Sequence, residues 1–113
     1  MDAGKEKVAR IAAAVEQRFG ERIEPDPQTP GAGQIARMLE HCSHHKWTDQ
    51  AVDPQLLRLL CAAALAAPSK SDLQQTDIIE VADPARRQAI VDTIDDMDWI
   101  MQAPVFLVFC GYN

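Results

Sequence analysis

Apolar residues near the start of the chain recur every three or four positions, which is the spacing of one helix face. The segment from Pro25 to Gly33 then carries three prolines and two glycines, which interrupt regular structure. The pattern therefore predicts an N-terminal helical extension over residues 1–24 and a Pro/Gly linker over residues 25–33. The residues of the helical face are Val8, Ile11, Ala12, Val15 and Phe19, with Gly20 as a stop.

Two further helices are predicted downstream. The first runs from about Gln34 to Cys42 and has one apolar face. The second begins at Asp53, a preferred N-cap residue, with Pro54 at the first helical position. It ends at Pro68, because proline cannot continue a helix. Its interior is apolar nearly all round, so we expect a central, buried helix.

Two strands and a fourth helix complete the pattern. Residues 77–82 read as a short strand, and Asp83–Pro84 starts a helix in the same way as Asp53–Pro54. Residues 104–110 form a continuous apolar run, typical of a strand buried on both faces. Two strands make a poor sheet. We therefore expect an α+β unit that is the N-terminal part of a larger fold, with a partner chain as the other source of missing strands.

Composition narrows the class of protein. The 113 residues match the size of one domain, and 11 Lys+Arg against 17 Asp+Glu give a formal net charge of −6. This acidity argues against a nucleic-acid partner. No apolar run approaches the roughly 20 residues of a membrane span, and no secretory signal opens the chain. Three widely spaced cysteines indicate reduced thiols and a cytoplasmic protein. Cys61 and Cys110 are expected to be buried in the core.

Residues 41–45, His-Cys-Ser-His-His, gather three imidazoles, a thiol and a hydroxyl at a predicted helix end. His41 and His45 have i, i+4 spacing, but a structural zinc site needs four ligands and no second Cys/His pair exists, so no metal is predicted. Two interpretations remain open. One is a solvated helix terminus, where histidine favours the negative end of the helix dipole. The other is contact with an anion or a cofactor.

Residues 67–74, Ala-Pro-Ser-Lys-Ser-Asp-Leu-Gln, form a polar loop between a helix and a strand. Functional residues concentrate in such loops. An ordinary connector rich in turn-forming residues has the same composition, and both interpretations remain open. The aspartates between residues 92 and 98 lack the spacing and glycine of a calcium-binding loop, and we interpret them as a solvated face.

Several segments together resemble the N-terminal half of the FMN-dependent nitroreductase family. The resemblance covers about residues 34–113, and its motifs occur in the order and spacing of that family. It implies a nitroreductase-like three-layer α/β/α sandwich, of which this chain carries the N-terminal portion with an incomplete central sheet. The segments are HCSHHKWTDQAV, LLRLLCAAALAAPSKSDLQQ, DIIEVADPARRQAIV and QAPVFLVFCG.

The resemblance also implies a binding site for FMN. Cys42 and His45 stand where the family usually has arginines, and Asp72 replaces a common asparagine. The resemblance names no catalytic residue, because the flavin performs the chemistry. The resemblance implies that His41, Ser43 and His45 lie near the phosphate and pyrimidine end of FMN, and that Asp72 and Gln74 lie along the ring or ribityl chain. The other implied cofactor-binding residues are Cys42 in the first segment and Ser69 and Lys70 as loop contacts.

The implied function is that of an FMN-dependent NAD(P)H oxidoreductase of nitroreductase type, or a fragment of one. Such an enzyme reduces small-molecule acceptors, namely nitroaromatics, quinones or flavins, and binds FMN between the subunits of a homodimer or other oligomer. The alternative is a truncated or degenerate nitroreductase-like module without flavin, which serves a structural or regulatory partner role. The change of both arginine positions favours this alternative, because histidine binds phosphate less strongly than a permanently charged guanidinium.

Overall fold

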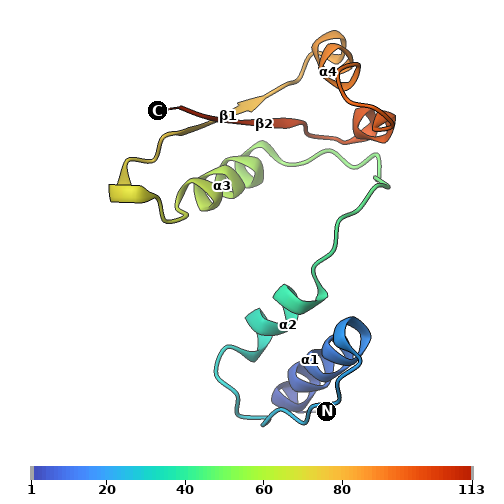
Figure 1. Ribbon diagram of the computed structural model, residues 1–113, viewed down its shortest axis with the longest axis vertical. Helices are drawn as coiled ribbons and strands as arrows, with labels where there is room; N and C mark the ends of the chain where they lie inside the picture. The colour runs from blue at the N-terminus through green and yellow to red at the C-terminus, as the bar shows by residue number, and fades with distance from the viewer. Residues whose placement is uncertain (1, 113) are drawn as a thin grey trace. The chain divides into compact units, whose positions relative to one another are not determined.

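The computed structural model describes residues 2–112 and divides the chain into two compact units, Met1–Ser43 and His44–Asn113. In chain order the elements are α1 (Ala3–Phe19), α2 (Ala32–Glu40), α3 (Pro54–Leu65), a 3-10 turn (Lys70–Asp72), β1 (Thr76–Glu80), α4 (Pro84–Val91), a second 3-10 turn (Asp98–Gln102) and β2 (Leu107–Gly111) (Figure 1).

The first unit is a pair of helices. α1 begins at Asp2, whose side chain accepts a hydrogen bond from the N–H of Gly4 at 3.3 Å. It ends at Gly20, which has φ 69°, a left-handed conformation that suits glycine. The predicted first helix and its stop are confirmed. α2 begins two residues before the predicted start, at Ala32, and ends at Glu40.

A small apolar core joins the two helices. Ala36 is fully buried, and alanine there allows the helices to approach closely. The connection between them also runs close to α1, because a Cβ on Gly4 would lie 2.7 Å from the carbonyl oxygen of Pro27. The buried core residues are Val8, Ile11, Ala32 and Ala36, and the half-buried residues around them are Val15, Ile23 and Leu39.

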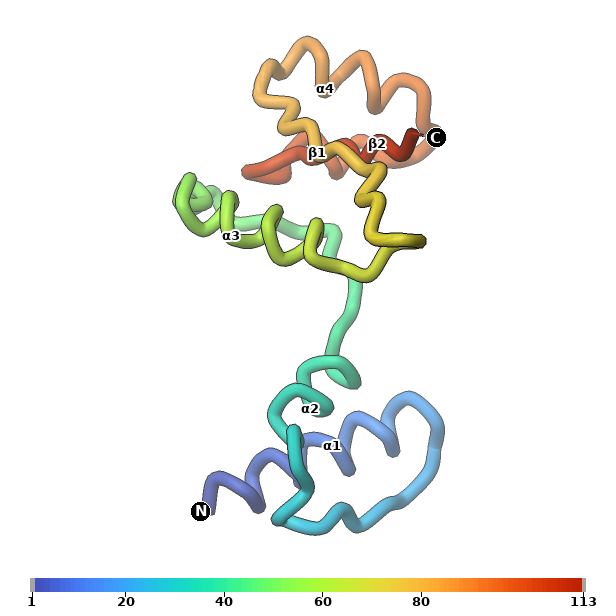
Figure 2. Tube along the Cα trace, turned by 90° about the vertical axis from the view of Figure 1, so that its left-hand side faces the viewer, coloured from blue at the N-terminus to red at the C-terminus, as the bar shows by residue number. Residues whose placement is uncertain are grey.

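The second unit is built around a sheet that has two antiparallel strands in the described chain. Ile78 of β1 pairs with Phe109 of β2. α4 and the turn Asp98–Gln102 lie on one side of the sheet and α3 lies on the other (Figures 1 and 2). The buried residues on the α4 side are Val81, Val91 and Phe106. The predicted α+β class is therefore confirmed.

The Asp–Pro starts of two helices are also confirmed. The side chain of Asp53 accepts from the N–H of Gln55 at 3.3 Å, and that of Asp83 accepts from the N–H of Ala85 at 3.1 Å. Each proline occupies a first-turn position, where no intrahelical N–H bond is needed.

The apolar run around β2 alternates between the two faces of the sheet. Phe106 and Val108 face the core under α4, while Val105, Leu107 and Phe109 line a hollow beside α3. The expectation of burial on both faces is wrong for the α3 side, where Phe109 remains 58% exposed. The reason is that α3 stands across the hollow instead of closing onto the strand.

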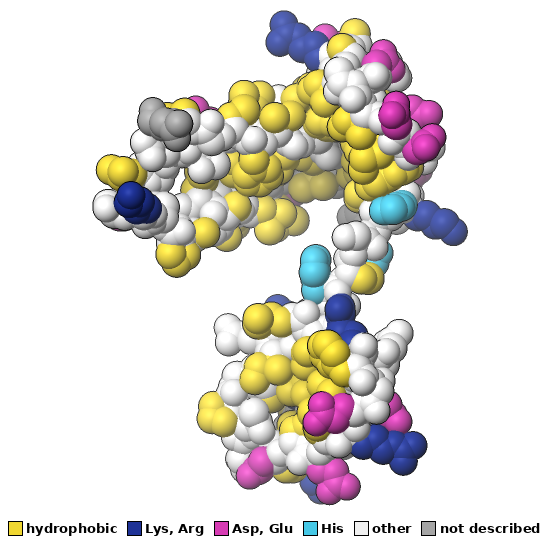
Figure 3. All heavy atoms as spheres, in the orientation of Figure 1, with side chains coloured by type: hydrophobic (Ala, Val, Ile, Leu, Met, Phe, Trp, Pro, Cys, Tyr) yellow, Lys and Arg dark blue, Asp and Glu magenta, His cyan; other side chains and the backbone are white. Residues whose placement is uncertain are grey.

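The expectation of a buried third helix is wrong for the same reason. α3 contains no buried residue, and Leu59 is 68% exposed. Cys61 and Cys110 are half-buried, not buried as predicted. Figure 3 shows hydrophobic side chains gathered between α3 and the sheet. The hollow has a volume of about 430 Å³ and is lined by Val52, Leu57, Leu60, Cys61, Ala64, Ile78, Val105, Leu107 and Phe109.

Within the described residues, no helix combines the length and apolar character needed to cross a membrane.

Arg87 ties α4 to the two chain segments that flank the sheet. Its Nε donates to the carbonyl of Val81 at 2.6 Å, and its NH1 donates to the carbonyl of Ala103 at 2.9 Å. The guanidinium also lies over the ring of Phe106, 5.9 Å from the centroid. One half-buried side chain therefore satisfies two backbone acceptors and covers a core aromatic.

We expect Arg87→Met to lower the free energy of unfolding of the second unit by on the order of 2 kcal/mol, because it removes two charge-assisted hydrogen bonds. Arg86→Met is the matched control. Arg86 is 83% exposed and lies 3.8 Å from Asp83, so its loss should cost less than about 0.5 kcal/mol. Urea unfolding followed by tryptophan fluorescence measures this unit, which contains both Trp47 and Trp99. Equal losses in the two variants would contradict the role of Arg87.

Candidate functional site

The predicted cofactor-binding residues fall into both units. His41, Cys42 and Ser43 close the first unit, while His45 and the loop Ser69–Gln74 belong to the second. All of these side chains are exposed. Each group is therefore in contact with solvent.

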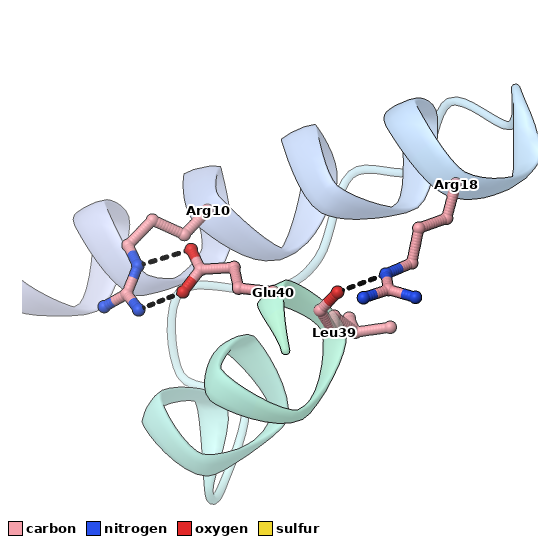
Figure 4. A network of polar contacts seen from close by, with 4 residues as sticks. All are labelled: Arg10, Arg18, Leu39 and Glu40. Carbon is pink, nitrogen blue, oxygen red and sulfur yellow. Dashed lines mark hydrogen bonds and ion pairs between the residues drawn. The ribbon is translucent and has the colours of Figure 1, made fainter. Parts of the chain in front are cut away.

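His41 is the C-cap residue of α2. Arg18 of α1 holds this end of the helix, because its Nε donates to the carbonyl of Leu39 (Figure 4). Its NH2 also donates to the carbonyl of His41. These carbonyls have no partner within the helix, and a guanidinium satisfies two of them at once. The backbone at the start of the His41–Ser43 segment is thus fixed from α1.

A second arginine of α1, about two turns before Arg18, holds the same end of α2. Arg10 and Glu40 form a two-pronged ion pair, in which Nε and Oε1 are 2.8 Å apart (Figure 4). Hydrogen bonding and the charge of Arg10 lower the pKa of Glu40, and Glu40 in turn raises the pKa of Arg10. The residues flanking the candidate segment are therefore anchored by two side chains of the N-terminal helix.

These contacts border a surface hollow of about 560 Å³ in the first unit. Its lining combines two guanidinium groups, one carboxylate, a thiol and small side chains. The lining residues are Arg10, Ala13, Ala14, Gln17, Arg18, Leu39, Glu40 and Cys42.

His45 lies in a row of three rings. Its imidazole stacks on Trp99 with the centroids 3.9 Å apart and the planes at 17°. Trp47 continues the stack with its centroid 6.1 Å from that of Trp99. The indole N–H of Trp47 donates to the carbonyl of Trp99 at 3.0 Å. The structure thus gives His45 a packing partner that the sequence pattern did not indicate.

The loop Ser69–Gln74 is held by its own side chains. The Oγ of Ser69 accepts from the N–H of Gln74 at 3.0 Å, and Oδ1 of Asp72 accepts from Nε2 of Gln74 at 3.0 Å. Lys70 opens the 3-10 turn and its ammonium is exposed. Ser69 and Gln74 also border a hollow of about 120 Å³, whose apolar walls include Pro68 and Phe109.

Three residues of this loop have left-handed backbone conformations. Ser71 and Asp72 have φ 53°, and Gln74 has φ 46°. Such values are uncommon outside glycine and cost energy, and they cluster at functional sites. The hydrogen bonds of Ser69 and Asp72 to Gln74 offset part of this cost. Two side-chain contacts of the loop thus hold Gln74 in its left-handed conformation.

No metal centre is found among the described residues, since no group of three or more His, Cys, Asp or Glu side chains there is placed to hold an ion.

Comparison with known proteins agrees with the resemblance. The chain is 37% identical over 77 residues to a Bacillus subtilis protein named FMN reductase (NAD(P)H), which is 68% of this chain and 31% of that protein. It is 36% identical over 77 residues to the oxygen-insensitive NADPH nitroreductase of Salmonella typhimurium, 68% of this chain and 32% of that protein. The resemblance to the FMN-dependent nitroreductase family is confirmed.

A third relative supports the same assignment. This nitroreductase-like chain is 32% identical over 76 residues to the NADPH-flavin oxidoreductase of Vibrio harveyi, 67% of this chain and 32% of that protein. No family model and no solved structure matches the chain. The chain spans about a third of the length of the curated relatives it matches.

The anchoring of α2 should depend on pH through Glu40. Its pKa is lowered in the folded chain, so the stabilisation is complete above the ordinary carboxyl range near about 4.3 and is lost as the pH falls through the lowered value. We expect Glu40→Gln to lower the melting temperature of the first unit at pH 7 but not at acid pH, where both proteins lack the charge. The methyl NMR signal of Ala36 reports this melting. Glu16→Gln, in the pair with Arg22, is the control and should keep the pH dependence of the parent.

Proposed function

We propose that the chain contributes to an FMN-dependent NAD(P)H oxidoreductase of nitroreductase type. The observation that carries this proposal is the 32–37% identity to a set of reductases named for FMN, flavin and nitro compounds. The class of acceptor is a nitroaromatic, a quinone or a flavin. We further propose a three-layer α/β/α sandwich for the complete fold and the cytoplasm as its location.

The candidate residues suit a flavin in their chemistry. In the second unit, Ser69, Lys70 and Gln74 supply a hydroxyl, an ammonium and an amide next to apolar walls. These groups would hold the ring edge and the ribityl chain, which need hydrogen-bond donors and acceptors. In the first unit, His41 and Ser43 would face the phosphate, and Cys42 lies beside them. His45 would reach the pyrimidine end with its ring oriented by Trp99.

Bound FMN would supply the hydride transfer from NAD(P)H to the acceptor. The residues of this chain would position the ring and tune its surroundings by hydrogen bonds and charge. No side chain of the chain is assigned a catalytic proton transfer.

A homodimer or other oligomer is part of the proposal. The α3 leucines remain exposed in the unit that contains them, and exposed apolar patches of this kind are covered in oligomers. The exposed residues are Leu56, Leu59, Leu60 and Leu65.

A second candidate function is a nitroreductase-like module that binds no flavin and serves as a structural or regulatory partner. Two observations favour it. Asp72 places a carboxylate in the loop and engages the amide of Gln74, and Cys42 and His45 provide no permanent positive charge.

Flavin binding separates the two candidates. We expect the purified protein to bind FMN with quenching of flavin fluorescence, and Asp72→Asn to tighten binding about tenfold, which is about 1.4 kcal/mol. The substitution removes a negative charge that would face an anionic cofactor, and a unit charge about 8 Å away contributes on the order of 2 kcal/mol at an effective dielectric of 20. Asparagine also keeps an oxygen for Gln74 and tolerates the left-handed conformation.

Asp77→Asn is the control for this titration, because it removes the same charge from an exposed position of β1. Equal affinities of the parent and Asp72→Asn would place Asp72 outside the site. Absence of flavin binding by every protein would favour the module without flavin.

The oligomer is tested by sedimentation. We expect the protein to sediment as a dimer or larger species, and Leu59→Asp to shift it toward monomer, because a carboxylate cannot be buried in an apolar contact without a partner. Phe19→Asp is matched in exposure, 69% against 68%, and lies at the end of α1. It should leave the sedimentation unchanged. A compact monomer in the parent protein would contradict the proposed assembly.

A further inference from the structure

Arg18 stands apart from the other arginines of the first unit whose contacts are known. Arg10 and Arg22 each form an ion pair with a glutamate. Arg18 instead donates to two carbonyl oxygens, those of Leu39 and His41. A carbonyl carries only a partial charge, so these contacts neutralise only part of the positive charge of Arg18.

This charge lines the hollow of about 560 Å³ together with Cys42 and Gln17. Arg10 and Glu40, which also border the hollow, neutralise each other in their ion pair. Two guanidinium groups and one carboxylate leave the lining with one net positive charge. The hollow therefore favours an anion over a neutral or cationic ligand.

The guanidinium of Arg18 also has N–H donors that its bonds to α2 do not use. It carries five N–H groups in one plane, and the bonds to Leu39 and His41 use two of them. The remaining three can meet an anion at the exposed surface of the side chain. Paired N–H donors of this geometry match the oxygens of a phosphate.

The contact of Arg18 with the end of α2 favours the binding of an anion at this site. The carboxyl end of a helix carries a partial negative charge that would repel a phosphate. Arg18 covers this end at Leu39 and His41, and so offsets the repulsion next to the exposed side chains of His41 and Ser43. The segment 41–43 has no permanently charged side chain of its own.

We propose that Arg18 of the N-terminal helix binds the phosphate of FMN, and that the hollow between α1 and α2 is the phosphate subsite. This inference rests on the proposed function. It makes α1 part of the cofactor site, because the cation comes from a helix more than twenty residues before the segment that it serves.

The test compares FMN with riboflavin, which has the same ring and ribityl chain but no phosphate. Fluorescence titrations at low salt give the affinity ratio of the two flavins for the parent, Arg18→Gln, Arg18→Lys and Arg22→Ala. We expect Arg18→Gln to weaken FMN binding by about tenfold or more and to leave riboflavin binding unchanged. Arg18→Lys should show a smaller loss, because lysine keeps the charge but not the planar set of donors.

Arg22→Ala removes an equal charge from a side chain that is 89% exposed and pairs with Glu16, and it should leave the ratio at the parent value. A change of both flavins by one factor in the Arg18 variants would overturn the inference, since it would show that Arg18 acts only by holding α2. An unchanged FMN affinity would also overturn it. Failure of the parent to bind either flavin would overturn the proposed function itself, and with it the phosphate subsite.

Discussion

The second unit depends on one constraint, which is that β2 and the two residues before it carry apolar side chains on both faces of a two-stranded sheet. Phe106 and Val108 are covered by α4 and the turn that follows, and this side forms a closed core. Val105, Leu107 and Phe109 face α3 across a hollow of about 430 Å³. Because protein interiors are close-packed, a hollow of this size with an apolar lining is an incomplete core. One face of β2 is thus packed against α4, and the other face borders the hollow beside α3.

In both units an arginine side chain donates hydrogen bonds to backbone carbonyls at the ends of helices or strands. Arg87 bonds the carbonyls of Val81, just after β1, and Ala103, before β2. Arg18 bonds the carbonyls of Leu39 and His41 at the end of α2. A short helix or a two-stranded sheet leaves many backbone acceptors near its ends. A guanidinium can donate to two of these acceptors at once and keeps its charge. The same property leaves donors available for a ligand.

Local signals in the sequence predicted most of the elements. The Asp–Pro starts at residues 53 and 83 and the stop at Gly20 depend on neighbouring residues alone, so they could be identified without tertiary structure. The exposure of α3 could not be predicted in this way. A helix that is apolar all round is compatible both with a closed core and with an exposed apolar surface. The stack of His45 on Trp99 and the contact of Arg18 with His41 join residues 54 and 23 positions apart, and no periodic pattern reports such pairs.

Composition alone favoured an ordinary connector for the loop between α3 and β1, and the structure adds backbone conformations that composition does not reveal. A connector that merely reverses the chain would place glycine at its left-handed positions, where glycine has no steric cost. This loop instead has Ser71, Asp72 and Gln74 in those conformations and holds Gln74 through side chains of its own. Backbone strain of this kind persists where the surrounding contacts fix it, and it is concentrated at ligand sites. Gln74 is therefore held in a left-handed conformation by two side chains of its own loop, a feature that composition does not reveal.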